Sequence, residues 1–391
     1  MLPPTRKPLR SQRAARSGRP KEPSVMTGDV YERLAEHLSA LGMGYPVTDD
    51  LLEILRDNFS PEEARVALAV PTRVAPLRTV PADDILPRVD LPGEETVEIL
   101  ERLAERGLLF SEETPSGERG YALQQVGFGF PQLYFWRGEE TDTARHMAGL
   151  VAKYFNRKVT REAYASETQP YRYVPASGSL APELQAVLPH HAMEAVLDNA
   201  REYAVCHCAC RMTALLRGRP CGHPTEVCIK FDEMARYVID RGLGREISRE
   251  EAGDLVAGAA EEGLVHFVDN AAGDIKHNCN CCGCACWNVG TIRRRKIPRD
   301  AIMATYFLRE TEEEACTGCG ACAEICPVQA VVMEEGRPVV DLDWCIGCGV
   351  CVPRCPEGAA GLRIREDRPA ALPAERFEEL HRMILREKGL L

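Results

Sequence analysis

A duplicated cysteine motif constrains this 391-residue chain more than any other feature. The segments "CTGCGACAEICP" (316–327) and "CIGCGVCVPRCP" (345–356) share the spacing C-x2-C-x2-C-x3-C-P, and the second copy lies 29 residues after the first. Three thiolates on one tight loop suit the irons of one cubane cluster, and the fourth cysteine, after a longer gap, is directed elsewhere. Two matching copies make a coincidental spacing or a zinc site a poor explanation.

This internal repeat resembles the bacterial two-cluster ferredoxin domain over residues 310–365. The resemblance implies two [4Fe-4S] clusters and a role in electron relay. It also implies that each cluster takes three ligands from one copy and one from the other. The first cluster would be held by Cys316, Cys319, Cys322 and Cys355. The second would be held by Cys345, Cys348, Cys351 and Cys326.

Ten further cysteines lie between residues 206 and 286. Disulfides are disfavoured in a reducing compartment, so metal ligation is the best explanation for so many thiols. We expect one or two additional iron-sulfur clusters here, with zinc or a redox-active dithiol as alternatives. The candidate ligands are Cys206, Cys208, Cys210, Cys221, Cys228, Cys279, Cys281, Cys282, Cys284 and Cys286.

The spacing within these ten cysteines suggests a split site. In extended segments, residues two apart share a face. One row of thiols would be Cys206, Cys208 and Cys210, and a second would be Cys282, Cys284 and Cys286, with Cys279 and Cys281 on the opposite face. We expect the two rows to meet, together with Cys221 and Cys228. Four nearby basic side chains would offset thiolate charge: Arg211, Arg217, Arg219 and Lys230. His207 and His223 are alternative ligands, hydrogen-bond donors beside the site or local structure.

Residues 27–125 resemble a winged helix-turn-helix. Helical apolar spacing, a helix start at Ser60-Pro61-Glu62-Glu63, a further helix and the Gly-containing hairpin "LLFSEETPSGERGYAL" carry this resemblance. The helix expected at residues 93–106 has a net charge of −3, which is unsuited to DNA phosphates. We therefore expect this unit to dock a partner or frame the middle sites, and we do not expect DNA as a partner.

The expected fold class is multidomain α+β: a winged-helix-like N-terminal unit, a cysteine-rich middle domain and a ferredoxin-like C-terminal domain with two [4Fe-4S] clusters. In the middle domain, Ser248 with Glu251 predicts a capped helix. The expected boundaries are a disordered basic tail at 1–26, the winged-helix-like domain at 27–125, a connecting α/β region at 126–200, the cysteine-rich domain at 201–300, the ferredoxin domain at 301–365 and a C-terminal helix at 366–391.

Charge and hydropathy limit the remaining functions. The net charge is −11, and residues 1–25 carry +6, which leaves −17 for the rest. Such an acidic body is unlike a general nucleic-acid binder. No apolar run approaches the roughly 18 residues of a spanning helix, so we expect a cytoplasmic protein without membrane insertion. No G-x-G-x-x-G follows a strand, which disfavours flavin or nicotinamide binding. The sequence is compatible with translation from Met1 or from Met26.

Together these patterns predict an electron-transfer component of anaerobe-type metabolism that exchanges electrons with a larger redox protein or enzyme complex, rather than a stand-alone enzyme. Two alternatives remain: an iron-sulfur-dependent winged-helix regulator, and a reductase whose middle cluster has an open iron. The sequence leaves the partner, the direction of electron flow, the reduction potentials, the number of middle clusters and the oligomeric state open.

Overall fold

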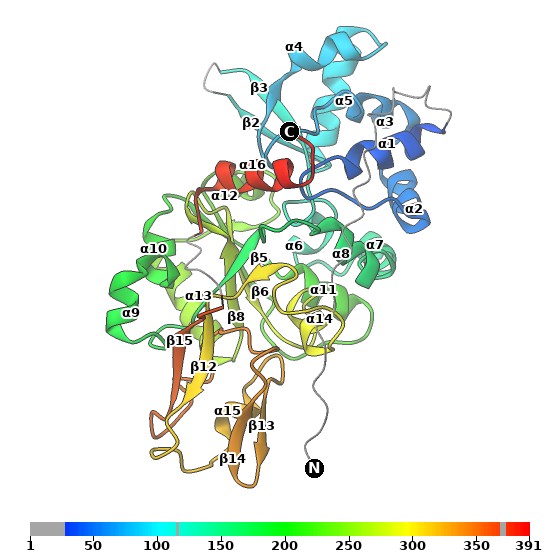
Figure 1. Cartoon of the computed structure of the whole chain (residues 1–391). Helices are drawn as coiled ribbons and strands as arrows, with labels where there is room; N and C mark the ends of the chain where they lie inside the picture. The colour runs from blue at the N-terminus through cyan, green and yellow to red at the C-terminus, as the bar shows by residue number, and fades with distance from the viewer. Residues whose placement is uncertain (1–27, 115–116, 368–372) are drawn as a thin grey trace, which may run out of the picture.

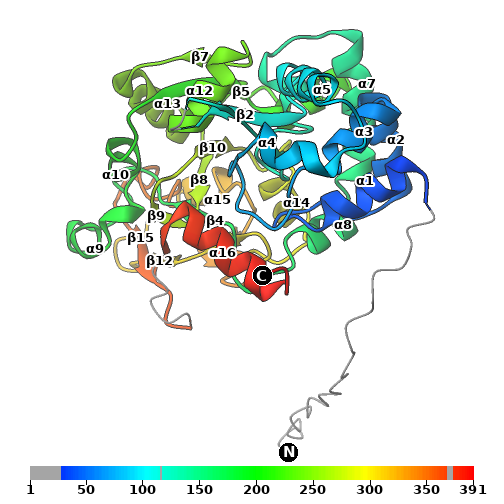
Figure 2. The same cartoon turned by 90° about the horizontal axis from the view of Figure 1, so that it is seen from above.

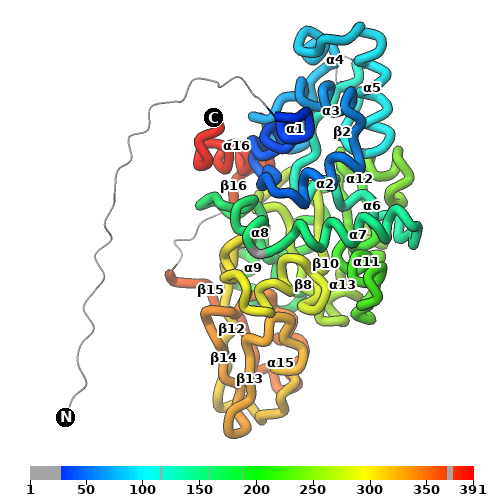
Figure 3. Tube along the Cα trace, turned by 90° about the vertical axis from the view of Figure 1, so that its right-hand side faces the viewer, coloured from blue at the N-terminus to red at the C-terminus, as the bar shows by residue number. Residues whose placement is uncertain are grey.

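Three tiers of structure follow one another from the N-terminal helices to the repeated cysteine motif (Figures 1 and 3). The computed structural model describes residues 28–114, 117–367 and 373–391. The predicted basic tail, residues 1–26, lies outside these residues. We call the tiers the N-terminal unit (28–123), the body (126–304 with 373–391) and the cysteine-repeat unit (307–364).

The N-terminal unit is a group of helices with a small sheet of order β1-β3-β2. Its helices are α1 (Val30–Ser39), α2 (Asp49–Asn58), α3 (Pro61–Ala67), α4 (Ala82–Ile85), the 3-10 turn η1 (Leu86–Arg88) and α5 (Gly93–Glu105). Its strands are β1 (Val80–Pro81), β2 (Leu109–Glu113) and β3 (Arg119–Leu123). The predicted helix start at Ser60 is confirmed, since Ser60 and Glu63 form a capping box with Pro61 in the first turn.

The predicted hairpin is also confirmed: β2 and β3 pair antiparallel from Leu109–Leu123 to Glu113–Arg119. The winged-helix assignment of the whole unit stays a prediction.

A seven-stranded sheet forms the centre of the body, in the order β11-β4-β8-β10-β6-β5-β7. Its pairings are antiparallel except for β11 with β4. The strands are β4 (Tyr171–Val174), β5 (Tyr203–His207), β6 (Glu226–Phe231), β7 (Arg245–Glu246), β8 (Val265–Asp269), β10 (His277–Cys281) and β11 (Met303–Ala304). Strands β4 and β11 come from outside the predicted range 201–300, so the sheet crosses both of those boundaries.

Helices surround this sheet (Figure 1). They are α6 (Leu133–Trp136), α7 (Asp142–Tyr154), α8 (Arg157–Ala163), α9 (Pro182–Val187), the 3-10 turn η2 (Pro189–His191), α10 (Met193–Asp198), α11 (Ala209–Leu216), α12 (Asp232–Asp240), α13 (Arg249–Glu261) and α14 (Val289–Arg293). Ser248 caps α13 as predicted, accepting a 3.1 Å hydrogen bond from the Glu251 backbone N–H. The Glu251 carboxylate pairs with Arg245 at 2.6 Å.

The cysteine-repeat unit is built from two short antiparallel pairs and one helical turn. Strands β12 (Phe307–Thr311) and β15 (Ala360–Ile364) pair at its base, and β13 (Val331–Glu334) with β14 (Arg337–Val340) forms its outer hairpin. The helical turn α15 (Ala321–Glu324) lies within the first cysteine copy.

After the repeat unit, the chain returns to the body. Strand β16 (Ala374–Arg376) pairs parallel with β9 (Ala271–Gly273), and α16 (Phe377–Glu387) follows. Figure 2 shows α16 extending toward the N-terminal helices. Lys388, just beyond it, donates to the carbonyls of Gly42 (2.6 Å) and Ala163 (2.8 Å), so the chain end ties the N-terminal unit to the body. Within the described residues, no helix has the length and apolar character needed to cross a membrane.

Candidate metal centres

The cysteine-repeat unit contains two small pockets, each lined by one predicted set of four thiols. One pocket is lined by Cys316, Cys319, Cys322 and Cys355, which we call the first quartet. The other is lined by Cys326, Cys345, Cys348 and Cys351, which we call the second quartet. Each pocket therefore gathers three cysteines of one copy and one of the other, as the ferredoxin resemblance implied.

The loops around these pockets suit thiolate ligands. Glycines between the cysteines adopt left-handed backbone angles, with φ of +74° at Gly318 and +60° at Gly347. At Gly347 a Cβ would lie 2.1 Å from the Phe307 carbonyl oxygen, so no larger residue fits. The Ala330 backbone N–H donates to the Cys326 sulfur at 3.2 Å. Hydrogen bonds of this kind stabilise a charged sulfur and tune a bound cluster.

A buried arginine lies between the two pockets. Arg309, in β12, lines both of them and is only 3% exposed. Its positive charge would offset part of the negative charge of two thiolate quartets. The sequence interpretation missed this residue, although a charged side chain after the otherwise apolar "YFL" run was the available signal.

Six of the ten middle cysteines line a single cavity of about 80 Å³ in the body. We call it the six-cysteine site. Its cysteines are Cys208, Cys210, Cys228, Cys279, Cys281 and Cys286. In the order 208, 210, 286, 281, 279 and 228, each thiol lies close enough to the next for the two to shift each other's pKa. A ring of six thiols around one void is a donor set for iron-sulfur chemistry.

Strand register explains how distant segments meet at this site. β10 lies between β8 and β6, which fixes its strand conformation over His277–Cys281. Alternation along that strand puts Cys279 and Cys281 on one face. β6 supplies Cys228, and the first turn of α11, with Cys208 as its N-cap, supplies Cys210. The predicted meeting of the segments 206–210 and 278–287 is therefore present in the structure.

The predicted rows of thiols are wrong in detail, because neither segment is extended over its whole length. The first row breaks where α11 begins at Ala209, and Cys206, on β5, does not line the cavity. The second row breaks because β10 ends at Cys281 and the chain turns through Gly283. Cys279 and Cys281, expected on an opposite face, line the cavity together with Cys286.

Aromatic side chains from residues 126–164 close the cavity. Trp136, Phe155 and Tyr164 all line it, and Phe155 stacks on Trp287 with ring centroids 5.1 Å apart and an interplanar angle of 11°. Trp136 is 2% exposed. The region that the sequence presented as a connector thus supplies an apolar wall of the six-cysteine site, which strengthens electrostatic interactions beside it.

A buried lysine gives the cavity a positive charge. Lys230 lines the cavity, is 2% exposed and lies with its Nζ 4.5 Å from the Trp136 ring centroid. Burial acts to lower the pKa of Lys230, but the neighbouring thiols of Cys228 and Cys206 outweigh it and the pKa is raised. Hydrogen bonds from Cys228 and Cys281, with help from Lys230, lower the pKa of Cys279 to about 5. The thiol contacts also lower the pKa of Cys208 and of Cys286, whereas they raise the pKa of the other three thiols, Cys210, Cys228 and Cys281.

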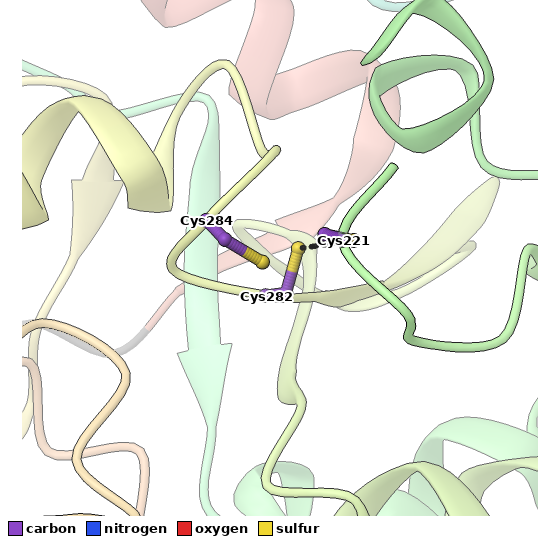
Figure 4. A group of neighbouring side chains, drawn as sticks. All are labelled: Cys221, Cys282 and Cys284. Carbon is purple, nitrogen blue, oxygen red and sulfur yellow. Dashed lines mark hydrogen bonds between the residues drawn. The ribbon is translucent and has the colours of Figure 1, made fainter. Parts of the chain in front are cut away.

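Three other cysteines form a separate, compact group (Figure 4). The Sγ atoms of Cys221, Cys282 and Cys284 all lie within 4.8 Å of one another, and those of Cys221 and Cys282 are 4.0 Å apart. We call them the three-cysteine group. Cys282 is buried and Cys284 is exposed. Cys206 belongs to neither site; it is fully buried opposite Cys228 in the β5–β6 register.

The other predicted ligands lie apart from these sites. His207 Nδ1 lies 3.0 Å from the Thr225 hydroxyl, and His223 lies 3.9 Å from the Glu262 carboxylate. Arg211, by contrast, donates to the Asn280 carbonyl. Burial acts to lower the pKa of Arg211, but nearby thiols, among them Cys208 and Cys282, raise it. Of the predicted basic residues, Arg211 and Lys230 thus both interact electrostatically with middle thiols.

The body and the cysteine-repeat unit meet around the second quartet. The Ala176 N–H donates to the Cys348 carbonyl at 3.0 Å, and Arg299 donates to the Cys345 carbonyl at 3.0 Å. Tyr173, on β4, is buried, and its pKa is raised well above the ordinary value by burial and by the thiols of Cys348 and Cys286. Tyr173 therefore lies near thiols of both the second quartet and the six-cysteine site.

Comparisons with known proteins match the cysteine-repeat unit. The family described as "4Fe-4S dicluster domain" matches residues 315–359. A 61-residue stretch is 41% identical to a protein of Methanosarcina acetivorans that is named as part of an ion-translocating oxidoreductase complex; the stretch is 15% of this chain and 20% of that protein. The chain thus spans only about a fifth of this relative's length. No solved structure shows a significant match. The matches support a 4Fe-4S domain and iron-sulfur electron transfer in general.

Proposed function

We propose that this protein is an iron-sulfur electron carrier in which a centre in the body exchanges electrons with two [4Fe-4S] clusters in the cysteine-repeat unit. The 4Fe-4S domain is the part that the family match supports directly. The body's centre and the route between the two are our extension, argued from the positions of the cysteines.

In this proposal each of three groups of cysteines would hold one iron-sulfur centre. The first and second quartets would each hold one [4Fe-4S] cluster, and the six-cysteine site would hold a third iron-sulfur centre. Bound clusters supply one-electron redox chemistry. Because six thiols line the body's cavity, a cluster short of protein ligands, as the reductase alternative requires, is not favoured there.

One observation carries the proposed route: the Ala176 N–H, two residues beyond the end of β4, donates to the Cys348 carbonyl of the second quartet at 3.0 Å. Tyr173, on β4 itself, has its pKa raised by burial and by thiols of both the second quartet and the six-cysteine site. Tyr173, Ala176 and Cys348 are all buried, so protein rather than water lies at this junction.

The exposure of the cysteines indicates which end of the proposed route faces the surface. The second quartet has three buried members, Cys345, Cys348 and Cys351, whereas Cys319 of the first quartet is exposed. Beside the first quartet, the outer hairpin exposes Val332 (47%) and Val339 (43%), which are cross-strand partners. We therefore propose that electrons enter or leave through the first quartet, at a partner that covers this hairpin.

The proposed partner is a larger redox complex. The relative from Methanosarcina acetivorans is named as one component of an ion-translocating oxidoreductase complex. That name describes the relative, and its likeness is limited to 61 residues, 15% of this chain. It supports a partner that is itself an oxidoreductase assembly, without identifying which one.

We assign the N-terminal unit, proposed as winged-helix-like, to docking or framing rather than to DNA. Its helix α5 exposes Glu94, Glu95, Glu98 and Glu105. The two arginines that could counter them are engaged by Glu63, at 3.1 Å from Arg102 and 2.9 Å from Arg106. A helix with this surface would be repelled by phosphates, which argues against the regulator alternative.

Iron content after anoxic purification tests the proposal. The wild-type chain is expected to hold clearly more than the roughly eight irons that two four-iron clusters account for. The Cys286→Ala variant should lose the irons beyond eight and keep about eight, because Cys286 lines the six-cysteine site and neither quartet pocket. Electron paramagnetic resonance of the reduced wild type should show magnetic interaction between the body's centre and the cysteine-repeat unit.

Cys206→Ala is the matched control. Cys206 is as buried as Cys286 and lies in the same part of the body, but it lines neither pocket nor cavity. Its substitution should leave the iron content unchanged. About eight irons in the wild type would show that the body holds no iron-sulfur centre. More than about eight irons in both the wild type and Cys286→Ala would show that Cys286 is not a ligand of that centre.

A further inference from the structure

The three-cysteine group differs from the other thiol sites in its geometry. Its three Sγ atoms converge within 4.8 Å of one another, with 4.0 Å between Cys221 and Cys282. In the part of the chain that the structure describes, no other trio of possible ligand atoms is found this close. The six cysteines of the neighbouring cavity instead surround a void of about 80 Å³.

The distance between the sulfur atoms distinguishes a site for a single ion from a site for a cluster. Four ligands at about 2.3 Å around one tetrahedral zinc lie roughly 3.8 Å from each other. The ligands of a cubane bind different irons, and their sulfurs lie farther apart, on the order of 6 Å. The observed 4.0 Å, and the limit of 4.8 Å for the trio, match one ion.

The surroundings of the group suit bound thiolates. The Ala285 backbone N–H donates to the Cys282 sulfur at 3.4 Å, and the positive charge of the Arg211 guanidinium acts on the same thiol. Both would stabilise the negative charge of a metal-bound thiolate. Cys282 is 2% exposed, whereas Cys284 is exposed, so one side of the group faces solvent.

We infer that Cys221, Cys282 and Cys284 bind one tetrahedral metal ion of the zinc class, with the fourth position open to solvent. The sulfurs come from two loops that share no strand pairing: the turn after α11 and the turn after β10 (Figure 4). An ion there fixes the second loop, which also carries Cys286 of the six-cysteine site. The ten middle cysteines thus divide into one iron-sulfur centre, one zinc-type site and the unassigned Cys206.

The site also fixes the contact with the cysteine-repeat unit. Gly283 lies between two of the three ligands, and a Cβ there would lie 1.8 Å from the carbonyl oxygen of Pro327. Pro327 directly follows Cys326 of the second quartet. The proposed ion therefore supports the loop at a point where the two parts of the molecule approach closely.

Metal content of the full chain, purified anoxically with zinc and iron both supplied, tests the inference. The wild type should hold about one zinc per chain. Cys284→Ser and Cys221→Ser should lose that zinc, at least tenfold after dialysis against a chelator, and keep the wild-type iron content. Cys284 is exposed, so its substitution leaves the core packing intact. Cys206→Ser, the control, should keep both metals.

Zinc-edge X-ray absorption on the wild type gives a second measurement that does not depend on a variant. The expected first shell is three sulfurs near 2.3 Å and one lighter atom. A wild type without zinc, a first shell without sulfur, or a Cys284→Ser variant that loses about four irons would overturn the inference. The iron test with Cys286→Ala remains separate, so failure of either proposal is distinguishable from failure of the other.

Discussion

Replacement of Gly283 by alanine tests the junction between the body and the cysteine-repeat unit. The added Cβ would lie 1.8 Å from the Pro327 carbonyl oxygen and 2.9 Å from its carbonyl carbon. An ordinary contact needs about 3.4 Å, so the loop and Pro327 must separate by about 1.6 Å. Both sides are backbone, and neither has a flexible end that can move aside. Overpacking of this kind costs about 1–3 kcal/mol, and we expect the upper end.

The expected result is a lower thermal midpoint. At about 2–4 °C per kcal/mol for a domain of 150–250 residues, a cost of about 3 kcal/mol lowers the midpoint by roughly 6–12 °C. Because loss of a bound cluster would make unfolding irreversible, variants should be compared at one scan rate, by circular dichroism and by loss of cluster absorbance. A cluster held by the second quartet, as proposed, should be lost first, because Pro327 adjoins Cys326.

Gly258→Ala is the control for this experiment. Gly258 lies within α13, and a Cβ there meets nothing within 4 Å. Alanine in a helix interior is favoured over glycine by up to about 1 kcal/mol, so this variant should be no less stable than the wild type. If the thermal midpoint of Gly283→Ala equals that of Gly258→Ala, the loop does not approach Pro327 closely in the protein.

Three further predictions concern other parts of the molecule. Lys230→Met removes the buried cation beside the thiols of the six-cysteine site. Because loss of a positive charge disfavours reduction, the midpoint potential of the proposed centre in the body should fall by tens of millivolts in a redox titration. The potentials of the clusters proposed for the two quartets should stay unchanged. Glu63→Gln should cost about 1–3 kcal/mol at pH 7, while the exposed Glu62→Gln changes little. Burial acts to raise the pKa of Glu63, but the Ser60 backbone N–H and two arginine partners lower it below the ordinary carboxyl value. The difference in unfolding free energy between wild type and Glu63→Gln should therefore be fully present above the ordinary carboxyl pKa. In acid denaturation it should vanish as the pH falls through the lowered pKa of Glu63. Arg295→Ala removes hydrogen bonds of 2.7 and 2.9 Å to two carbonyls of the cysteine-repeat unit, and limited proteolysis should release that unit faster; an unchanged rate would contradict this role.

The cysteine-repeat unit was predictable because its information is local. The ligands of each copy lie within eleven residues, so spacing alone indicates which thiols share a loop. The helix start at Ser60 and the hairpin after α5 were predictable for the same reason: caps and turns depend on neighbours in the sequence. The basic tail stays a prediction, since it lies outside the described residues.

The middle sites were only partly predictable, because their grouping depends on long-range pairing. Period two along "NCNCCGCACW" suggested that Cys282, Cys284 and Cys286 act together, but the register of β10 with β8 ends the strand at Cys281. Cys284 and Cys286 then belong to different sites. No local pattern marks where a strand stops when its partners come from other segments.

The aromatic neighbours of the thiols were the least predictable part. Tyr173 lies 33 residues before Cys206, the first cysteine of the chain, and Phe155 lies farther still. Lys230 was named because it follows Cys228 by two residues, whereas nothing near Tyr173 in the sequence points to a thiol. Such residues are recruited by the sheet, not by a motif.

The pairing of β12 with β15 has a consequence for how this chain was assembled. Phe307 and Ile364 are register partners, so the cysteine-repeat unit leaves and rejoins the body at adjacent points. The main sheet is complete at β11, before the unit begins, and β16 resumes pairing with the body after it. The unit is therefore an insertion whose two ends meet at one strand pair, so a change of chain length between β12 and β15 leaves the path of the rest of the chain unchanged.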